Sequence, residues 1–341
     1  MEIGVFSTGL WKLRNRLNTL TDSKIKRLGF FSSRADVIAG WGHKNTATEA
    51  RNAAIAHAIP YVAVEDGFLR SINPGSKEPP FSMIIDRTGV YYDARQPSDL
   101  EAFIRRRAQI EDLHQETRKA MAFLRDNRLS KYNNSTLHDI SELPEISTSR
   151  NECVLVVDQT AGDASITGGL ATDHSFSSML ASALSENPKS QILLRVHPES
   201  MSGAKPGHFS EGQLRQLAAT NNDIAKALNS RRIRLTPEPI NPWLLLENCS
   251  KTYCISSQLG FEALIAGCEV HCFGVPFYAG WGLTKDRGAD VPRRRTQASL
   301  EDVFAGTYFD YCRYISEDGL RILDFWQTAL LLRKKSTNAF R

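Results

Sequence analysis

The chain has 341 residues, which at about 150 residues per domain predicts two domains, and its 41% apolar and 23% charged residues are typical of a globular protein. This composition excludes collagen-like, disordered and coiled-coil classes. The net charge of +4 is small for the length, and no apolar run approaches the roughly 20 residues that cross a bilayer, so we expect neither a nucleic-acid-binding nor a membrane-spanning protein.

Short apolar runs alternate with helical patterns from the N-terminus onward. Strands are predicted at 3–6, 28–31, 37–40, 61–64 and 83–86, with a helix at 46–58 and a loop at 70–81. A polar helical stretch over 98–127 follows. Alternation of this kind predicts a mostly parallel sheet with helices on its faces.

A second alternating set begins after a linker at 133–152, which is rich in Ser, Thr, Asn and Pro. Its predicted strands are 154–157, 191–196, 233–235, 251–256 and 269–273, and its helix 176–184 carries an apolar stripe at i, i+3, i+4 and i+7. We therefore expect a Rossmann-like domain at 1–150 and a second at 151–318. A final helix within 319–341 should pack back on the first domain.

Several common catalytic motifs are absent from the sequence. G-x-G-x-x-G does not follow the first strand of either half, and Walker A, H-E-x-x-H and G-x-S-x-G do not occur. The six cysteines contain no C-x-x-C pair and sit mostly in apolar segments, which suits a reducing cytoplasm. Basic clusters at 105–107, 231–232, 293–295 and 333–335 suit an anionic partner, or are solvated faces.

The first candidate site follows the strand at 61–64. Glu65 and Asp66 are adjacent carboxylates, followed by Gly67 and Arg70. One carboxylate could act as a general acid or base if burial raises its pKa. The alternative is a helix cap with a surface ion pair.

The second candidate site follows the strand at 154–157. Small residues flank Asp163, so a substrate could approach its carboxylate closely, as a nucleophile on a sugar carbon requires. Asp163 could equally be the cap of a helix.

Two further strand ends carry polar groups. Arg195 and His197 end one strand, and either could contact a phosphate. Ser256 and Ser257 precede a helix whose first turn contains Glu262, an arrangement that could bind an anion and a ribose. Together the four sites indicate a cleft enzyme with a nucleotide-linked donor. Because no D-x-D occurs, we expect a nucleoside monophosphate donor and no metal or other cofactor.

At these residues the chain resembles the KpsC-type capsule polysaccharide transferases, retaining enzymes that transfer β-Kdo, a 3-deoxy keto-sugar acid, from CMP-Kdo. The resemblance runs through Gly9 and Trp11, then W-G-H (41–43), E-D-G-F-L-R-S (65–71), Y-Y-D-A (91–94), S-K-Y-N (130–133), V-D-Q (157–159), D-A-S-I (163–166), V-H-P (196–198), G-F-E-A-L (260–264), P-F-Y-A-G-W-G-L-T (276–284) and R-R-R (293–295).

The resemblance implies a GT-B-like α/β fold in which two Rossmann-like domains face a central cleft. It also implies double displacement, with Asp163 as the nucleophile and Glu65, or else Asp66, as the acid/base. CMP would be held by Arg195, His197, Pro198, Ser256, Ser257, Gln258 and Glu262. The residues expected to contact Kdo or the acceptor are Gly9, Arg70, Ser71, Lys131, Gln159, Trp281 and Arg294.

Family members usually carry two such modules, and this chain holds one that resembles the first, judged by its start at Met1 and by D-Q-T at 158–160. That module implies a β-(2→4) linkage to a Kdo-bearing phosphatidylglycerol-type acceptor. It also implies a peripheral position at the cytoplasmic face of the bacterial inner membrane, with capsule biosynthesis or export proteins as partners. The alternatives are another GT-B-type CMP- or CDP-donor transferase of inverting mechanism, or a non-catalytic module that binds anionic glycans or lipids.

Overall fold

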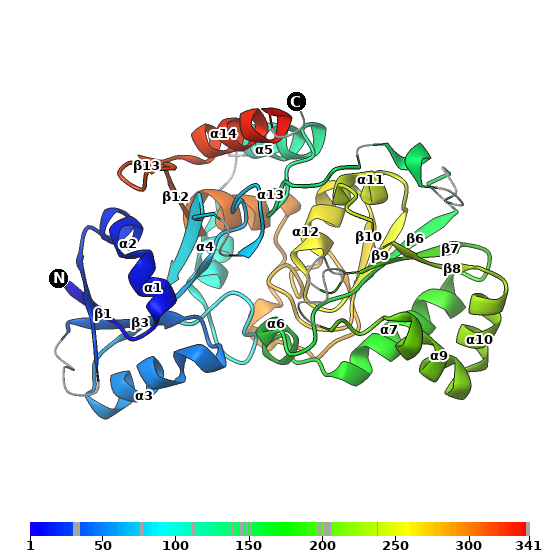
Figure 1. Ribbon diagram of the computed structural model, residues 1–341, viewed down its shortest axis with the longest axis horizontal. Coiled ribbons are helices and arrows are strands. Elements are labelled where there is room, and N and C mark those ends of the chain that lie inside the picture. Colours follow the sequence, from blue (N-terminus) through cyan, green and yellow to red (C-terminus); the bar gives the residue numbers. More distant parts are fainter. Residues whose placement is uncertain are drawn as a thin grey trace. The chain divides into compact units, whose positions relative to one another are not determined.

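The computed structural model describes residues 1–29, 35–75, 78–110, 114–137, 139–143, 146, 149–150, 152–196, 200, 206–236 and 238–338. The chain divides into two compact units (Figure 1). Unit 1 comprises Met1–Asn134 and Glu301–Arg341, and unit 2 comprises Ser135–Leu300.

Unit 1 is built around a mixed sheet. Its elements are β1 (Glu2–Val5), α1 (Thr8–Lys12), α2 (Arg14–Thr21), β2 (Lys24–Arg27), β3 (Val37–Trp41), the 3₁₀ turn η1 (Asn45–Ala47), α3 (Thr48–Ala56), β4 (Tyr61–Asp66), β5 (Ser82–Asp86), α4 (Asp99–Arg107), α5 (His114–Asp126), α13 (Leu300–Phe304), the π-helical η5 (Ala305–Tyr311), β12 (Cys312–Ile315), β13 (Ile322–Leu323) and α14 (Phe325–Asn338). Among the described residues the strand order is β13-β12-β5-β4-β3-β1-β2.

The first four strands of unit 1 are parallel, and β5, β12 and β13 are antiparallel to their neighbours. The sheet of this half is therefore mixed, with three parallel and three antiparallel pairings among the described strands, where the sequence predicted a mostly parallel one. The strand predicted at 28–31 was also misplaced: β2 ends at Arg27, which is paired with Val5 at the end of β1. The buried Leu28 follows it outside the strand, and residues 30–31 lie outside the described part.

Helices cover both faces of the unit 1 sheet. One face packs against α1 and α2 through a core that includes Val5, Leu10 and Leu17. The other face packs against α3, whose Ala50 and Ala54 contact Ile38. Side chains alternate along β3, so Ala39 lies in the first core and Ile38 in the second.

Unit 2 contains η3 (Ile140–Glu142), β6 (Cys153–Val157), α6 (Ala164–Gly168), α7 (Asp173–Glu186), β7 (Gln191–Arg195), α9 (Glu211–Thr220), α10 (Asn222–Asn229), β8 (Ile233–Thr236), α11 (Pro242–Glu247), β9 (Lys251–Cys254), α12 (Gln258–Ile265), β10 (Glu269–Cys272), β11 (Lys285–Asp286) and η4 (Pro292–Arg294). Its described strands are all parallel, in the order β11-β10-β9-β6-β7-β8. This is the 3-2-1-4-5-6 order of a Rossmann sheet.

The core of unit 2 follows the predicted patterns. All five residues of β6 are buried, and the stripe of α7 that contains Phe176, Met179 and Leu180 packs on the sheet. α7, α9 and α10 cover one face of this sheet, and α11 and α12 lie on the other (Figure 1). The predicted α/β class with two Rossmann-like halves, as in GT-B-like enzymes, is confirmed.

The unit boundaries lie at 134 and 300, whereas the sequence predicted 150 and 318. Residues after Ser135 belong to unit 2 because Leu137 forms a β-bridge with Ile240. The chain rejoins unit 1 before 318 because β12 pairs with β5.

The final helix predicted within 319–341 is α14, which spans Phe325–Asn338 and packs on unit 1. α14 lies beside α5 (Figure 1), where Trp326 Nε1 donates to Glu116 and the Trp326 ring lies 5.7 Å from that of Phe123. The neighbouring Phe325 is buried against aromatic rings of η5 and β12.

Candidate functional site

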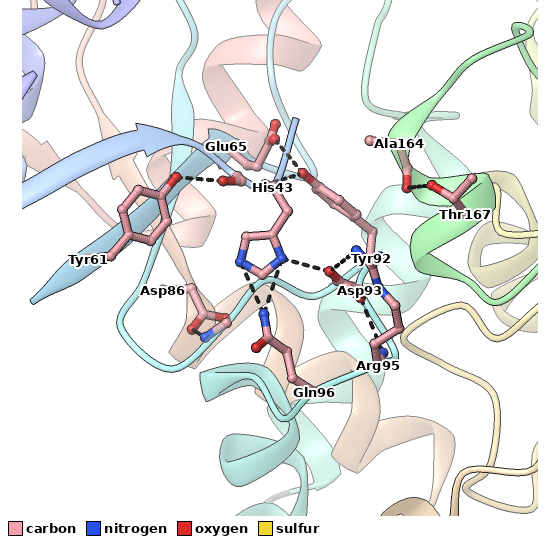
Figure 2. Close-up of polar contacts among 12 residues, drawn as sticks. His43, Tyr61, Glu65, Asp86, Tyr92, Asp93, Arg95, Gln96, Ala164 and Thr167 are labelled. Carbon is pink, nitrogen blue, oxygen red and sulfur yellow. Dashed lines mark hydrogen bonds and ion pairs between the residues drawn. The ribbon is translucent and has the colours of Figure 1, made fainter. Parts of the chain in front are cut away.

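Unit 1 places the Glu65–Asp66 pair at the carboxyl end of β4. Successive strand residues point to opposite faces, so the two carboxylates have separate surroundings. Glu65 is only 5% exposed, and its Oε2 lies 2.7 Å from Nζ of Lys44. Its Oε1 accepts a 3.2 Å hydrogen bond from the Tyr92 hydroxyl (Figure 2). Glu65 is therefore held by a cation and a phenol, neither of which sequence reasoning assigned to it.

Burial raises the pKa of Glu65, and the nearby Asp66 adds to this increase. The ammonium groups of Lys44 and Lys131 act in the opposite direction. Burial alone would lower the pKa of Lys131, but the oxygens of Tyr91, Tyr132, Asp66 and Glu65 raise it above that of an ordinary lysine. A buried carboxyl with a raised pKa and fixed cations beside it can take up and release a proton.

Asp66 forms an ion pair within its own turn. Its Oδ2 lies 2.9 Å from Nε of the buried Arg70, whose NH1 donates to Ser71 Oγ at 2.7 Å. Ser71 Oγ in turn donates to the backbone of Asn73. Arg70 and Ser71, predicted to contact substrate, thus hold together the start of the 70–81 loop, and a substrate role for them stays a prediction.

Gly9 follows β1, the strand next to β3. A Cβ at Gly9 would lie 2.9 Å from Nε1 of Trp41, so glycine allows this indole to pack against the start of α1. The strand order β2-β1-β3-β4 reverses between the parallel strands β1 and β3, and open α/β sheets bind ligands at such a reversal. The topology of unit 1 thus places Gly9 and Gly42 at the expected ligand edge.

A histidine–aspartate network adjoins Glu65 (Figure 2). The backbone N–H of His43 donates to the Tyr92 hydroxyl at 2.9 Å, and its Nδ1 lies 2.7 Å from Asp93 Oδ2. Arg95 donates to both oxygens of Asp93. Burial alone would raise the pKa of Asp93, but the bonds from Arg95 and His43 lower it well below its usual range.

Unit 2 brings Gln159 and Ser256 together at the carboxyl ends of the neighbouring strands β6 and β9. The Gln159 amide donates to the hydroxyls of Ser165 and Ser256, both at 3.1 Å, and accepts from Ser256 N–H at 2.9 Å. Ser256 Oγ also donates to Ser165 Oγ. The strand order reverses between β6 and β9, so this polar network lies at the switch point of a Rossmann sheet.

Asp163 is the N-cap of α6. Its Oδ1 accepts a 2.8 Å hydrogen bond from Ser165 N–H, and the side chain is half-buried. The capping alternative is thus present in the structure. Oδ2 has no hydrogen-bond partner within the described part of the chain, which leaves one carboxylate oxygen for chemistry.

Four of the residues predicted to bind a nucleotide, Ser256, Ser257, Gln258 and Glu262, lie just before or within α12. Ser257 caps this helix by accepting from Leu259 N–H, and Gln258 donates to Glu262 at 3.2 Å. Burial lowers the pKa of Arg195 to about 10, while Glu262 and Glu238 oppose that shift. Arg195 NH2 donates to the carbonyl of Ile240, and NH1 has no partner among the described residues. His197 and Pro198 lie outside the described residues.

Trp281 and Arg294 are both about 1% exposed. Trp281 Nε1 donates to the carbonyl of Phe277 at 2.8 Å, and Arg294 NH1 donates to that of Pro276 at 2.7 Å. Both therefore stabilise the 276–282 loop, and their predicted contact with substrate stays untested.

Residues 36–314 match the family described as "Capsule polysaccharide biosynthesis protein". The chain belongs to this family. It is 38% identical over 293 residues to capsule polysaccharide modification protein LipA of Neisseria meningitidis, a match that covers 83% of this chain and 39% of the relative. The chain thus spans about two fifths of the length of that curated relative.

Two solved structures resemble the whole chain. The β-Kdo 2,4 transferase of Thermosulfurimonas dismutans KpsC is 36% identical, with a TM-score of 0.85 and 98% coverage of both chains. The β-Kdo 2,7 transferase of the same protein is 23% identical, with a TM-score of 0.71 and coverage of 98% and 99%. The family resemblance stated from the sequence is confirmed.

This family member has a second polar cluster that sequence reasoning missed. Asp158 Oδ1 accepts from the backbone N–H groups of Gln159 and His208, and His208 Nε2 lies 3.1 Å from Asp173. The His208 ring stacks on Phe176 at 3.7 Å. Burial alone would lower the pKa of His208, but Asp158 and Asp173 raise it. Nothing in the sequence near His208 indicated this contact.

The basic clusters of this capsule-family chain have partners within the protein. Arg107 donates to both oxygens of Asp310, Arg232 donates to backbone carbonyls, and Lys335 pairs with Glu317. Arg295 pairs with Asp290. These contacts favour a structural role for much of the clustered charge.

The described part of the chain contains neither a cluster of metal ligands nor a membrane-spanning helix. No three His, Cys, Asp or Glu side chains in that part of the chain gather as metal ligands would. None of its helices is both long and apolar enough to cross a bilayer.

Proposed function

We propose that the chain is a β-Kdo glycosyltransferase that uses CMP-Kdo as its donor. The observation that carries this proposal is the 36% identity, over 98% of both chains, to a β-Kdo 2,4 transferase. The same comparison supports a β-(2→4) linkage. The match to the 2,7 transferase is weaker in both identity and TM-score.

The proposed mechanism is double displacement with retention of configuration. Asp163 attacks the anomeric carbon of Kdo, a bond forms to its carboxylate oxygen, and CMP leaves with the electron pair of the broken C–O bond. The acceptor hydroxyl then attacks the same carbon, the bond to Asp163 breaks, and Glu65 takes the hydroxyl proton. The oxygen of Asp163 without a partner and the raised pKa of Glu65 support these two roles.

Donor binding is proposed for the switch point of unit 2. Arg195 has a guanidinium nitrogen without a partner in the described part of the chain, which suits the CMP phosphate. Ser256, Ser257, Gln258 and Glu262 would contact the rest of CMP. His197 and Pro198 are proposed to contribute on the resemblance alone.

The acceptor is proposed to be a Kdo-bearing lipid of the phosphatidylglycerol type, reached at the cytoplasmic face of the inner membrane beside other capsule biosynthesis proteins. Gly9 and Lys131 are proposed to line its path in unit 1. No metal is proposed for the chemical step.

A transfer assay tests this function. The full chain is incubated with CMP-Kdo generated in place and a synthetic Kdo-terminated acceptor, and NMR determines the anomeric configuration and linkage of the product. We expect a β-(2→4) product from the wild type and from Asp173→Asn, whose side chain is 85% exposed, and none from Asp163→Asn. An α-configured product would contradict the mechanism, and absence of transfer would contradict the function.

A further inference from the structure

Unit 1 contains a cavity of about 550 Å³ that none of the assigned roles uses. Its wall is formed by α3, the amino end of β4 and residues 86–96 after β5. A volume of this size is within the range of about 300–1,000 Å³ that holds small molecules in proteins. We call it the α3 cavity.

The charged groups of the α3 cavity fall into two sets. Asp93 is already paired with Arg95 and His43, and Asp86 accepts from the Gly89 and Thr88 N–H groups and from the Tyr311 hydroxyl. Groups of the protein therefore already bind both carboxylates, so these two residues do not indicate a cation site.

Arg51 and Arg87 also line the cavity, and neither has an ion pair with a carboxylate in the part of the chain that the structure describes. Nε of Arg51 is buried and has no hydrogen-bond partner among those residues. The clustered arginines elsewhere in the chain have intramolecular partners, so these two guanidinium groups differ from them. A guanidinium binds carboxylate and phosphate oxygens through paired, charge-assisted hydrogen bonds.

The polar groups beside the two arginines suit the same kind of ligand. Tyr61 and Gln96 lie on the wall with His43 (Figure 2), and the Gln96 amide is 3.2 Å from both ring nitrogens of His43. On the α3 side the wall is apolar, with Ala54, Ile55 and Ile59. Ile55 is 80% exposed, so its side chain is open to a ligand that enters from solvent.

We propose that the α3 cavity binds an oxyanion, a phosphate or a carboxylate, through Arg51 and Arg87, with an apolar substituent of the ligand lying against Ile55 and Ile59. His43 joins this cavity to Glu65, since its backbone N–H donates to the Tyr92 hydroxyl that donates to Glu65. We assign this ligand to the acceptor, an assignment that rests on the proposed function. Binding of an oxyanion in the α3 cavity does not rest on it.

The test measures binding of hexyl phosphate, hexanoate and inorganic phosphate to the full chain by titration calorimetry. We expect saturable binding of hexyl phosphate, of hexanoate or of both. Comparison of the two affinities shows whether the cavity prefers a phosphate or a carboxylate. Binding should weaken at least tenfold in Arg51→Gln and in Arg87→Gln. It should change less than twofold in Arg313→Gln, an exposed arginine of β12 outside the cavity. Ile55→Ser should remove the preference for hexyl phosphate over inorganic phosphate.

Folding of each variant is checked by its melting temperature. If Arg51→Gln does not fold, Arg51→Lys keeps the charge and loses the paired geometry, and Arg87 is exposed enough to be replaced safely. Equal binding by the wild type and both arginine variants, or no binding of any probe, would overturn the proposal. Release of CMP from CMP-Kdo without acceptor is measured in parallel, because loss of that reaction alone would count against the proposed function and not against the cavity.

Discussion

Substitution of Gly42 by alanine tests whether the packing around Glu65 is as tight as the structure indicates. Gly42 has a φ of +46°, a conformation that residues with a side chain rarely adopt. A Cβ at this position would overlap both the Tyr92 hydroxyl and Glu65 Oε1. The substitution therefore strains the backbone and displaces the carboxylate together with the phenol that binds it.

The expected cost has two parts. The left-handed conformation costs an alanine about 1–2 kcal/mol. Overlap in a packed interior adds about 1–3 kcal/mol. Gly75→Ala separates the two parts, because Gly75 also has a positive φ, +71°, but a Cβ there would meet no atom within 4 Å.

Both variants are compared with the wild type by thermal unfolding and by the rate of Kdo transfer to the Kdo-terminated acceptor, the step that requires Glu65. For a unit of this size, 1 kcal/mol corresponds to about 2–4 °C in Tm. We expect Gly42→Ala to melt about 2–12 °C below Gly75→Ala and to lose most activity, while Gly75→Ala keeps it. Equal melting temperatures and equal rates for the two variants would refute the packing argument.

Three further substitutions have expected outcomes. Burial raises the pKa of Glu65 in the folded protein, so as the pH rises this carboxyl ionises first in the unfolded chain. The free energy of unfolding of the wild type, relative to that of Glu65→Gln, should therefore decrease from about pH 4 upward until the pH passes the raised pKa. A difference that stays constant between pH 4 and 8 would contradict this. Gln159→Ala removes the hydrogen bonds of this side chain to Ser165 and Ser256 and should lower the free energy of unfolding in urea by about 2–3 kcal/mol, whereas a loss below about 0.5 kcal/mol would show that the network is not formed. Phe325→Ala should lower the free energy of unfolding by about 3–5 kcal/mol, because Phe325 is buried. Leu330 is 51% exposed, so Leu330→Ala should lower it by less than about 0.5 kcal/mol. Equal losses would mean that α14 does not pack as described.

The sequence predicted the elements whose residues are buried on a regular period. β6 is an unbroken apolar run, and α7 combines the Thr172 capping box with a stripe of five buried residues. β2 was misplaced because only Ile25 of its four residues is buried, so charged neighbours conceal the strand. The antiparallel β12 could not be foreseen because it pairs with β5, more than 200 residues earlier in the chain.

The positions of the candidate residues at strand ends were predictable, whereas their contacts were not, and their roles stay predictions. Glu65 and Ser256 were identified because a polar group at the end of a buried run is visible in the sequence, and Asp163 because small residues flank it shortly after such a run. The bond between Gln159 and Ser256 depends on β6 lying beside β9, which local sequence does not encode. The role of His43 beside Asp93 was missed for the same reason, although both residues lie in motifs that carried the family resemblance.

The central claim is a covalent Kdo intermediate on Asp163, and intact-protein mass spectrometry tests it most directly. The wild type, Asp163→Asn and Asp173→Asn are each incubated with CMP-Kdo generated in place, without acceptor. Asparagine keeps the capping oxygen of α6, so Asp163→Asn should remain folded. We predict a mass increase of one Kdo on the wild type and on Asp173→Asn and no increase on Asp163→Asn. The same increase on Asp163→Asn, or none on a wild type that still extends the acceptor, would contradict the proposed nucleophile.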